Sequence, residues 1–283
     1  MEIKKVGIVG CGTMGSGIAQ VCAQSGYQVV ASEINEELLK KGLAMVASSL
    51  AKAVEKGRLS PQDKEATLGR IKGTTKTQDF ADCDLMIEVA VEQMEIKKKV
   101  FADLDKICPK HAILASNTSC LSIIDLGMAT RRPEKVLGLH FFNPVPIMKL
   151  LEIVTTIATG EETLKTAKEF GNKVGKTIVI AKDMPGFIVN RLVVPFILNA
   201  ISMLDAGVAT KEDIDTGVNL GLNHPMGPLA LADLIGLDTL YFIANAIYDE
   251  FKDPQYASPP LLRKMVTAKW LGRKTGKGFY EYK

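Results

Sequence analysis

Cysteine and histidine are scarce in this 283-residue sequence, which has five of the first and three of the second. The cysteine number is odd and no two cysteines form a C-x-x-C pair, so the pattern argues against both a disulfide framework and a zinc site. We therefore predict reduced packing residues and no bound metal. The cysteines are Cys11, Cys22, Cys83, Cys108 and Cys120.

The chain also lacks a large net charge and a long apolar run. Its composition, with 24% charged residues, 47% hydrophobic residues and a formal net charge of +3, is that of an ordinary globular protein. No uncharged apolar run approaches membrane-spanning length, and the first residues lead directly into a predicted strand without room for a signal or transit peptide. We expect a cytoplasmic protein with no nucleic-acid or membrane partner.

One glycine-rich stretch near the N-terminus organises the rest of the chain. The β-branched run 6–9 leads into glycines spaced as G-x-G-x-x-G and then into helix-forming residues. Gly10 suits a tight turn, Gly12 leaves no side chain between the main chain and a pyrophosphate, and Gly15 lets the helix pack closely on the strand. The N–H groups at the start of this helix, around Thr13 and Met14, would then point at the phosphates.

An acidic residue stands where a dinucleotide site needs one. Glu33 follows the predicted second strand, 28–32, and lies 18 residues after Gly15. A carboxylate there accepts hydrogen bonds from the adenosine ribose and repels a 2′-phosphate, so the sequence favours NAD over NADP. The alternative is a glycine turn in a protein that binds no nucleotide.

Strands and helices alternate from residue 3 to about residue 181, which predicts a mostly parallel sheet with right-handed crossovers. A turn-rich break at 182–186 follows, and the remaining pattern is helical. We predict an α/β chain with a Rossmann-like domain over 1–183 and an all-helical domain over 184–283.

Polar side chains follow three of the predicted strands. Glu92 comes after the strand at 84–90, Ser119 comes after the strand at 112–116, and His140 and Asn143 end the strand that starts at residue 136. Because ligands bind at the carboxyl ends of strands in open α/β sheets, we expect these residues near the cofactor. Lys97 lies in the first turn of the helix that follows Glu92.

A histidine can accept the proton that an alcohol loses when it is oxidised, since its unperturbed pKa is about 6.5. His140 is the histidine expected at the cofactor edge, whereas His111 is predicted in a solvated turn and His224 in a structural break between helices. Glu152, an acid inside the apolar run 150–154, needs a compensating group and is the natural partner of His140. The alternative is that the two residues meet other, purely structural partners.

Several segments together resemble those of the short-chain L-3-hydroxyacyl-CoA dehydrogenases, most closely the bacterial 3-hydroxybutyryl-CoA branch. The resemblance covers essentially the whole chain in the right order, and the combination is specific although each piece alone is not. The segments are Gly10-Cys-Gly-Thr-Met-Gly15, Ser116-Asn-Thr-Ser119, His140-Phe-Phe-Asn-Pro-Val-Pro146, Pro185-Gly-Phe-Ile-Val-Asn-Arg191, His224-Pro-Met-Gly-Pro228 and Gly272-Arg-Lys-Thr-Gly-Lys-Gly-Phe-Tyr280.

The resemblance implies NAD-dependent, reversible oxidation of an (S)-3-hydroxyacyl-CoA in fatty-acid or butyrate metabolism, by a homodimer formed through the C-terminal helices. It implies that His140 is the general base and that Glu152 pairs with it. Ser119 and Asn190 would hydrogen-bond the substrate's oxygens.

The resemblance also assigns residues to the two ligands. Ser49, Lys52 and Lys56 would face the phosphates of coenzyme A, and the two lysines lie one helical turn apart. Glu33 stands where many relatives have aspartate. Two alternatives remain: a dehydrogenase of a free hydroxy acid or sugar acid, and a non-catalytic dinucleotide-binding protein. The residues expected around NAD are Gly10, Gly12, Thr13, Met14, Gly15, Glu33, Glu92, Lys97, Asn143 and Lys274.

Overall fold

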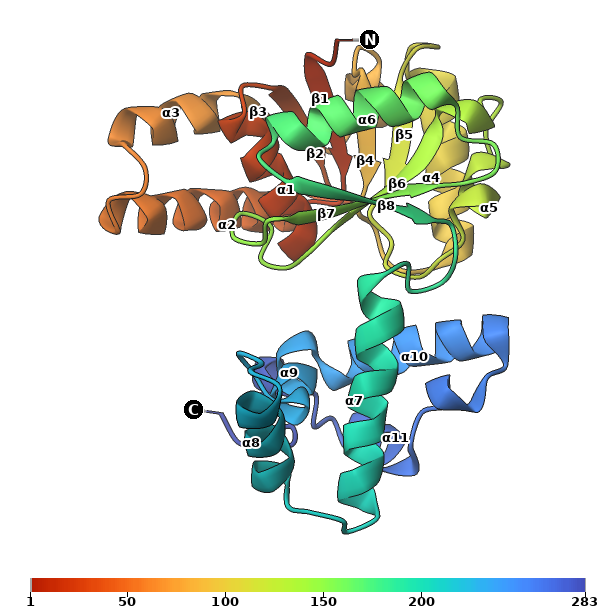
Figure 1. Cartoon of the computed structure of the whole chain (residues 1–283). Coiled ribbons are helices and arrows are strands. Elements are labelled where there is room, and N and C mark those ends of the chain that lie inside the picture. Colours follow the sequence, from red (N-terminus) through yellow and green to blue (C-terminus); the bar gives the residue numbers. More distant parts are fainter. Residues whose placement is uncertain (1, 283) are drawn as a thin grey trace. The chain divides into compact units, whose positions relative to one another are not determined.

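In the computed structural model, which describes residues 2–282, the chain forms two compact units, Met1–Met184 and Pro185–Lys283 (Figure 1). The sequence places the domain boundary after residue 183, and the structure divides the chain one residue later. Met1 and Lys283, the outer ends of the two expected domains, lie outside the described residues.

The first unit is built on a single sheet, to which the described residues contribute eight strands in the order β3-β2-β1-β4-β5-β6-β7-β8. Neighbouring strands are parallel except for β6 and β7, which are antiparallel, so the predicted mostly parallel α/β fold is confirmed. The strands are β1 (Lys5–Val9), β2 (Gln28–Ser32), β3 (Ile71–Thr74), β4 (Leu85–Glu88), β5 (Ile113–Ser116), β6 (Val136–Phe141), β7 (Leu150–Thr155) and β8 (Thr177–Lys182).

The strand order reverses between β1 and β4. The chain proceeds from β1 outward to β2 and β3, and then returns to the other side of β1 as β4. Val9 pairs with Glu88, so the segments that follow β1 and β4 leave the sheet at the same edge. In open α/β sheets this reversal point is where ligands bind.

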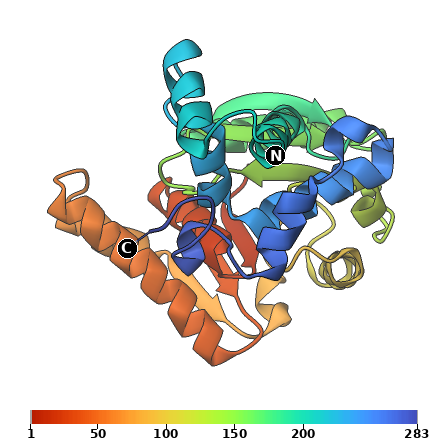
Figure 2. The ribbon, with the colours of Figure 1, turned by 90° about the horizontal axis from the view of Figure 1, so that it is seen from below.

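Helices connect the strands of the first unit. Ile18 of α1 and Phe170 of α6 share one buried core with Ile8 and Ile87 of the sheet. The long helix α2 is capped by Asn35, whose Oδ1 accepts a hydrogen bond from the main chain, and it lies along one side of the unit in both ribbon views (Figures 1 and 2). The helices are α1 (Thr13–Gln24), α2 (Glu36–Glu55), α3 (Pro61–Gly69), α4 (Met94–Ile107), α5 (Ile123–Gly127) and α6 (Glu161–Lys173), with short 3₁₀ turns η1 (Thr77–Phe80) and η2 (Pro133–Lys135).

The second unit is helical, as predicted. Its first helix begins at Val189 because Gly186 and Phe187, with φ of +80° and +46°, adopt left-handed conformations that a helix does not continue. The helical run around Gly236, whose φ is +99°, breaks into two helices bent by 96°. The elements are α7 (Val189–Asp205), α8 (Lys211–Gly221), α9 (Pro228–Ile235), α10 (Leu237–Phe251) and α11 (Pro260–Thr267), with η3 (Pro254–Tyr256) and η4 (Arg273–Thr275).

Within residues 2–282, no single helix has both the length and the apolar composition needed to cross a membrane. The bent pair α9 and α10 meets those criteria only when its two helices are taken together.

Candidate active site

The glycine-rich turn joins β1 to α1, and its three glycines differ in how closely the rest of the chain packs against them. A Cβ on Gly15 would lie 1.8 Å from the carbonyl oxygen of Gly10, and a Cβ on Gly10, whose φ is +95°, would lie 2.7 Å from the carbonyl oxygen of Val89. A Cβ on Gly12 would meet nothing within 4 Å. Gly10 and Gly15 are therefore required by close packing, whereas Gly12 borders open space at the N-terminus of α1, where main-chain N–H groups favour an anion.

Glu33 lies against this turn. One carboxylate oxygen accepts a hydrogen bond from the N–H of Cys11 at 2.8 Å, and the other accepts one from the N–H of Ile34 at 3.2 Å. Burial, together with the negative charge of Glu33, raises the pKa of the Cys11 thiol to about 11. An open cradle of N–H groups beside a fixed carboxylate fits the pyrophosphate and ribose of a dinucleotide.

His140 and Glu152 face each other across the one antiparallel strand pair in the described part of the sheet. The register of β6 and β7 places them directly opposite, and Nδ1 of His140 lies 2.6 Å from Oε2 of Glu152. Both side chains are buried, with 5% and 0% of their surface exposed. The ring of Phe142 packs 4.6 Å from the imidazole, centroid to centroid.

The other ring nitrogen of His140 points to Ser119. The distance from Nε2 to Oγ of Ser119 is 3.1 Å. The main-chain N–H of Ser119 donates to Oε1 of Glu92 at 2.9 Å, and the hydroxyl of Thr118 donates to the same oxygen. The structure thus brings Glu92, Ser119 and His140 together at or beyond the carboxyl ends of β4, β5 and β6, with Glu152 opposite His140 near the amino end of the antiparallel β7, while their roles in catalysis stay predictions.

Lys97, expected beside the cofactor, belongs to a buried ion cluster. Only 1% of its side chain is exposed, and its Nζ lies 2.8 Å from Oε1 of Glu88, 3.1 Å from Oε2 of Glu92 and 3.2 Å from the carbonyl oxygen of Ala90. A direct contact between Lys97 and NAD stays a prediction. Asn143, by contrast, is exposed, two residues beyond the end of β6.

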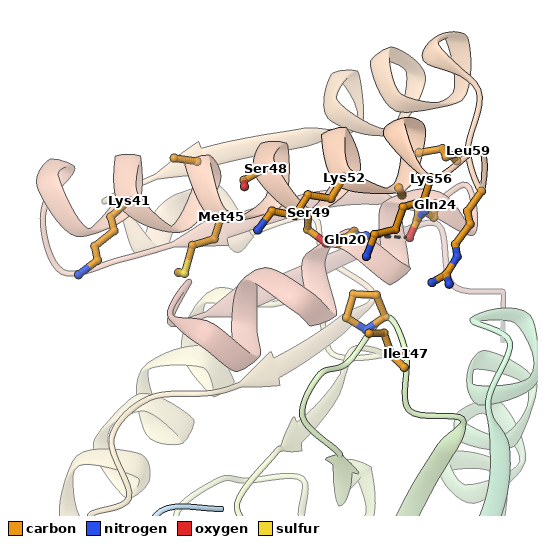
Figure 3. A pocket seen from close by; sticks show the side chains of 14 residues that line it. Gln20, Gln24, Lys41, Met45, Ser48, Ser49, Lys52, Lys56, Leu59 and Ile147 are labelled. Carbon is orange, nitrogen blue, oxygen red and sulfur yellow. Dashed lines mark hydrogen bonds between the residues drawn. The ribbon is translucent and has the colours of Figure 1, made fainter. Parts of the chain in front are cut away.

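Ser49, Lys52 and Lys56 line one groove of about 770 Å³ (Figure 3). The groove lies between α2, α1 and the loop that carries Pro146 and Ile147. No carboxylate belongs to its lining within residues 2–282, so the groove is cationic. Its lining is Gln20, Gln24, Lys41, Ala44, Met45, Ser48, Ser49, Lys52, Ala53, Lys56, Arg58, Leu59, Pro146 and Ile147.

A buried lysine supports the loop at this groove. Nζ of Lys176 donates hydrogen bonds to the carbonyl oxygens of Val145 and Met148 at 2.6 and 2.7 Å. Burial lowers the pKa of Lys176, an effect that the nearby Cys22 partly opposes. The ammonium thereby ties the loop between β6 and β7 to the start of β8.

Asn190 and Lys274 belong to the second unit. Asn190 lies in the first turn of α7, and Nζ of Lys274 pairs with Asp238 at 2.7 Å. The assignment of both residues to the ligands stays a prediction.

The two other histidines have structural partners. His111 is half-exposed, but it is more than a solvated turn residue because its Nε2 lies 3.0 Å from Oδ1 of Asp84. His224 meets the ring of Phe196 at 5.7 Å in an edge contact.

Several residues at the site were given no role from the sequence. Glu88 could have been predicted, because it ends the apolar run 85–87 and a buried carboxylate there needs a compensating group, as Glu152 does. Asn117 directly follows the apolar strand 112–116, but the sequence does not show that its Oδ1 accepts the N–H of Phe141 at 2.8 Å and so joins β5 to β6. Lys41 and Arg58 add two cations to the groove that nothing in their neighbourhood distinguishes from ordinary surface residues.

Comparison with known proteins identifies the family. The family model for the NAD binding domain of 3-hydroxyacyl-CoA dehydrogenase matches residues 5–184, and the model for its C-terminal domain matches residues 186–282. The chain is 47% identical to a 3-hydroxybutyryl-CoA dehydrogenase of Mycobacterium tuberculosis over 282 residues, which is 99% of each chain. A protein of the same name from Clostridioides difficile is 47% identical over 278 residues, 98% of this chain and 99% of the relative.

A solved structure gives the same result. The crystal structure of an (S)-3-hydroxybutyryl-CoA dehydrogenase from Ralstonia eutropha superposes with a TM-score of 0.95 at 45% identity, and the match covers all of both chains. The chain described here therefore belongs to the 3-hydroxyacyl-CoA dehydrogenase family, with the family's NAD-binding domain followed by its C-terminal domain.

Proposed function

We propose that this protein catalyses the reversible NAD-dependent oxidation of a short (S)-3-hydroxyacyl-CoA, such as 3-hydroxybutyryl-CoA, to the 3-ketoacyl-CoA. The observation that carries the proposal is the buried pair of His140 and Glu152, 2.6 Å apart, in the same sheet as a glycine turn that fits a dinucleotide. The names of the relatives from M. tuberculosis and C. difficile support the choice of substrate.

His140 acts as the base through Nε2. Since Nδ1 is held by Glu152, the hydrogen-bonded carboxylate keeps the Nδ1–H tautomer and leaves Nε2 able to accept the proton of the 3-hydroxyl. The negative charge of Glu152 then stabilises the imidazolium, and in the reverse direction Nε2 returns the proton to the ketone oxygen. When bound, NAD supplies the acceptor for the hydride from carbon 3.

Ser119 positions the reacting oxygen, because its hydroxyl lies 3.1 Å from the same Nε2 and can share a hydrogen bond with the substrate. Asn190 of the second unit hydrogen-bonds the thioester side. Glu92, Asn143 and Lys274 contribute to the cofactor site, and Glu33 selects NAD over NADP by repelling a 2′-phosphate.

The cationic groove holds the phosphates of coenzyme A. Lys52 in the last turn of α2 and Lys56, the residue that follows the helix, are four residues apart and line the same groove, and Ser49 adds a hydroxyl donor. Charge-assisted hydrogen bonds to phosphate are stronger than neutral ones, which makes this groove a better site for a coenzyme A thioester than for a free acid.

The protein acts as a homodimer through its helical unit, in a reducing compartment such as the cytoplasm. Leucine side chains exposed on the helical unit support the homodimer, because such apolar surface favours burial against a second copy. Between 60% and 82% of the surface is exposed at Leu192, Leu220 and Leu222. The five buried, unpaired cysteines support a reducing compartment. Light scattering on the purified protein measures the oligomer directly.

The decisive experiment compares acetoacetyl-CoA with acetoacetate as oxidants of NADH. We expect turnover with the thioester and little with the free acid. Equal rates would favour a free-acid dehydrogenase, and no turnover with either compound would favour a protein that binds nucleotide without catalysis.

The role of the groove is tested with Lys52→Glu and Lys56→Glu. Each variant should raise the KM for acetoacetyl-CoA by about tenfold or more and change kcat little, since a phosphate contact binds ground state and transition state alike. Lys64→Glu on α3, which lies outside the groove lining, is the matched control. An unchanged KM in both groove variants would remove the phosphates from this groove.

A further inference from the structure

Glu88 is a fully buried carboxylate that the proposed mechanism does not use. It ends β4 after three buried apolar residues, and none of its side-chain surface is exposed. Oε1 accepts hydrogen bonds from the N–H of Ala90 at 2.6 Å and from Nζ of Lys97 at 2.8 Å. Oε2 accepts from Nζ of Lys97 at 3.0 Å and from Oγ of Ser116 at 2.7 Å.

These bonds lead to Ser119 by two routes. On the first, Oγ of Ser116 accepts the main-chain N–H of Thr118 at 3.2 Å and so fixes the turn immediately before Ser119. On the second, Lys97 lies 3.1 Å from Oε2 of Glu92, whose other oxygen accepts the N–H of Ser119 at 2.9 Å. Glu88 is therefore connected to Ser119 through Ser116 on one side and through Lys97 and Glu92 on the other.

The position of Lys97 depends on the charges of the two carboxylates that share it. One ammonium, that of Lys97, is shared between Glu88, which is fully buried, and Glu92, of whose side chain 28% is exposed. A buried ion pair is seldom more stabilising than apolar packing, so stability alone gives little reason for an acid at the end of an apolar strand. Loss of the charge on Glu88 would draw Lys97 toward Glu92 and move the oxygen that holds Ser119.

We propose that Glu88 is a positioning residue, which holds the turn of Ser119 and the Lys97–Glu92 pair so that the serine hydroxyl meets Nε2 of His140. This inference rests on the proposed function, because it assigns Glu88 a role in that same site. Glu88→Gln keeps the size of the side chain but can offer only one acceptor oxygen where two are used, so one of the two routes must reorganise.

The test is a double-mutant cycle of Glu88→Gln and Ser119→Ala, with kcat for NADH oxidation by acetoacetyl-CoA as the readout. We expect Glu88→Gln alone to lower kcat by about tenfold to a hundredfold, since a misplacement of about 1 Å at a reacting group has effects of that size. In the Ser119→Ala background the same change should lower kcat by less than about threefold, because its target is already gone. Losses that multiply fully would overturn the proposal.

Two further variants keep this test independent of folding. Ser116→Ala removes only the first route and should show the same coupling to Ser119, so it replaces Glu88→Gln if that variant does not fold. Asp105→Asn is the matched control, because Asp105 also forms a buried ion pair, with Arg132, in which 8% and 10% of the side chains are exposed. It should lower the melting temperature and leave kcat unchanged.

The inference and the proposed function fail in different ways. A wild-type protein without thioester-dependent NADH oxidation overturns the proposed function and this inference with it. An active wild-type protein in which Glu88→Gln leaves kcat unchanged, or in which neither Glu88→Gln nor Ser116→Ala couples to Ser119→Ala, overturns the role of Glu88 alone.

Discussion

Alanine at Gly12 should weaken cofactor binding with little loss of stability, whereas alanine at Gly15 should strongly destabilise the protein. The added Cβ at Gly12 meets nothing within 4 Å, and its φ of −70° and ψ of −160° suit any residue. The cost in folding free energy is then about 0.5–1 kcal/mol, the difference expected for alanine at a helix N-cap. The Cβ at Gly15 would lie 1.8 Å from a main-chain oxygen, an overlap that costs about 1–3 kcal/mol or more.

The effect on binding follows from the same geometry. A methyl group at Gly12 holds the pyrophosphate away from the N–H groups of α1, and each charge-assisted hydrogen bond that is lost is worth about 1.5–3 kcal/mol. The Kd for NADH, measured by fluorescence titration, should therefore rise by about tenfold to a hundredfold. Urea unfolding measures the stability of each variant.

Gly69→Ala is the control for this experiment, because it too adds a Cβ that meets nothing within 4 Å, at the end of α3 and away from the glycine turn. It should leave NADH binding unchanged. An unaltered Kd in Gly12→Ala, or an equal loss of stability in Gly12→Ala and Gly15→Ala, would refute the different roles assigned to the two glycines.

Three further predictions concern catalysis, acid stability and thiol chemistry. Glu152→Gln should lower kcat by about a hundredfold to ten-thousandfold, because the imidazolium loses its buried counter-ion; a loss below about threefold, or an equal loss in the exposed control Glu169→Gln, would contradict this. Burial tends to raise the pKa of Asp84, but hydrogen bonds from two main-chain N–H groups and a histidine outweigh it and hold the pKa below 3.8. The contribution of the Asp84 carboxylate to the free energy of unfolding is thus complete above pH 3.8 and is lost as the pH falls through the lower folded pKa. Asp84→Asn should therefore lower the free energy of unfolding by about 1 kcal/mol at pH 7 and by progressively less in acid. The exposed control Asp82→Asn should unfold like the wild type at each pH. Since burial raises the pKa of Cys11 to about 11, only about one Cys11 thiol in a thousand is ionised at pH 8. All five cysteines are buried, so a thiol reagent should label none of them until the protein unfolds. Rapid labelling of the native protein would contradict this prediction.

Much of the fold could be predicted from local sequence, because local interactions decide it. The order of β-branched run, three glycines and helix-forming residues specifies the turn at Gly10, since only glycine takes its φ of +95° easily and only glycine at residue 15 avoids the main chain. The alternation of strands and helices predicted the mostly parallel sheet, and the change of pattern near Pro185 predicted the helical unit that follows.

The contacts within the candidate site depend on strand pairing. An acid in the run 150–154 needed a partner, but it is the antiparallel register of β7 on β6 that brings Glu152 to 2.6 Å from His140. The sequence likewise placed Lys97 at the start of a helix, and only the packing of that helix on β4 encloses the ammonium between Glu88 and Glu92.

The sequence by itself thus determined where the chain turns, which segments are strands or helices, and which polar residues reach the edge of the sheet. The tertiary structure decided which of these residues share a proton or a cation. The physical reason is range: turn geometry and side-chain periodicity act between near neighbours along the chain, whereas ion pairs and hydrogen bonds in the interior depend on register between strands that are far apart in sequence.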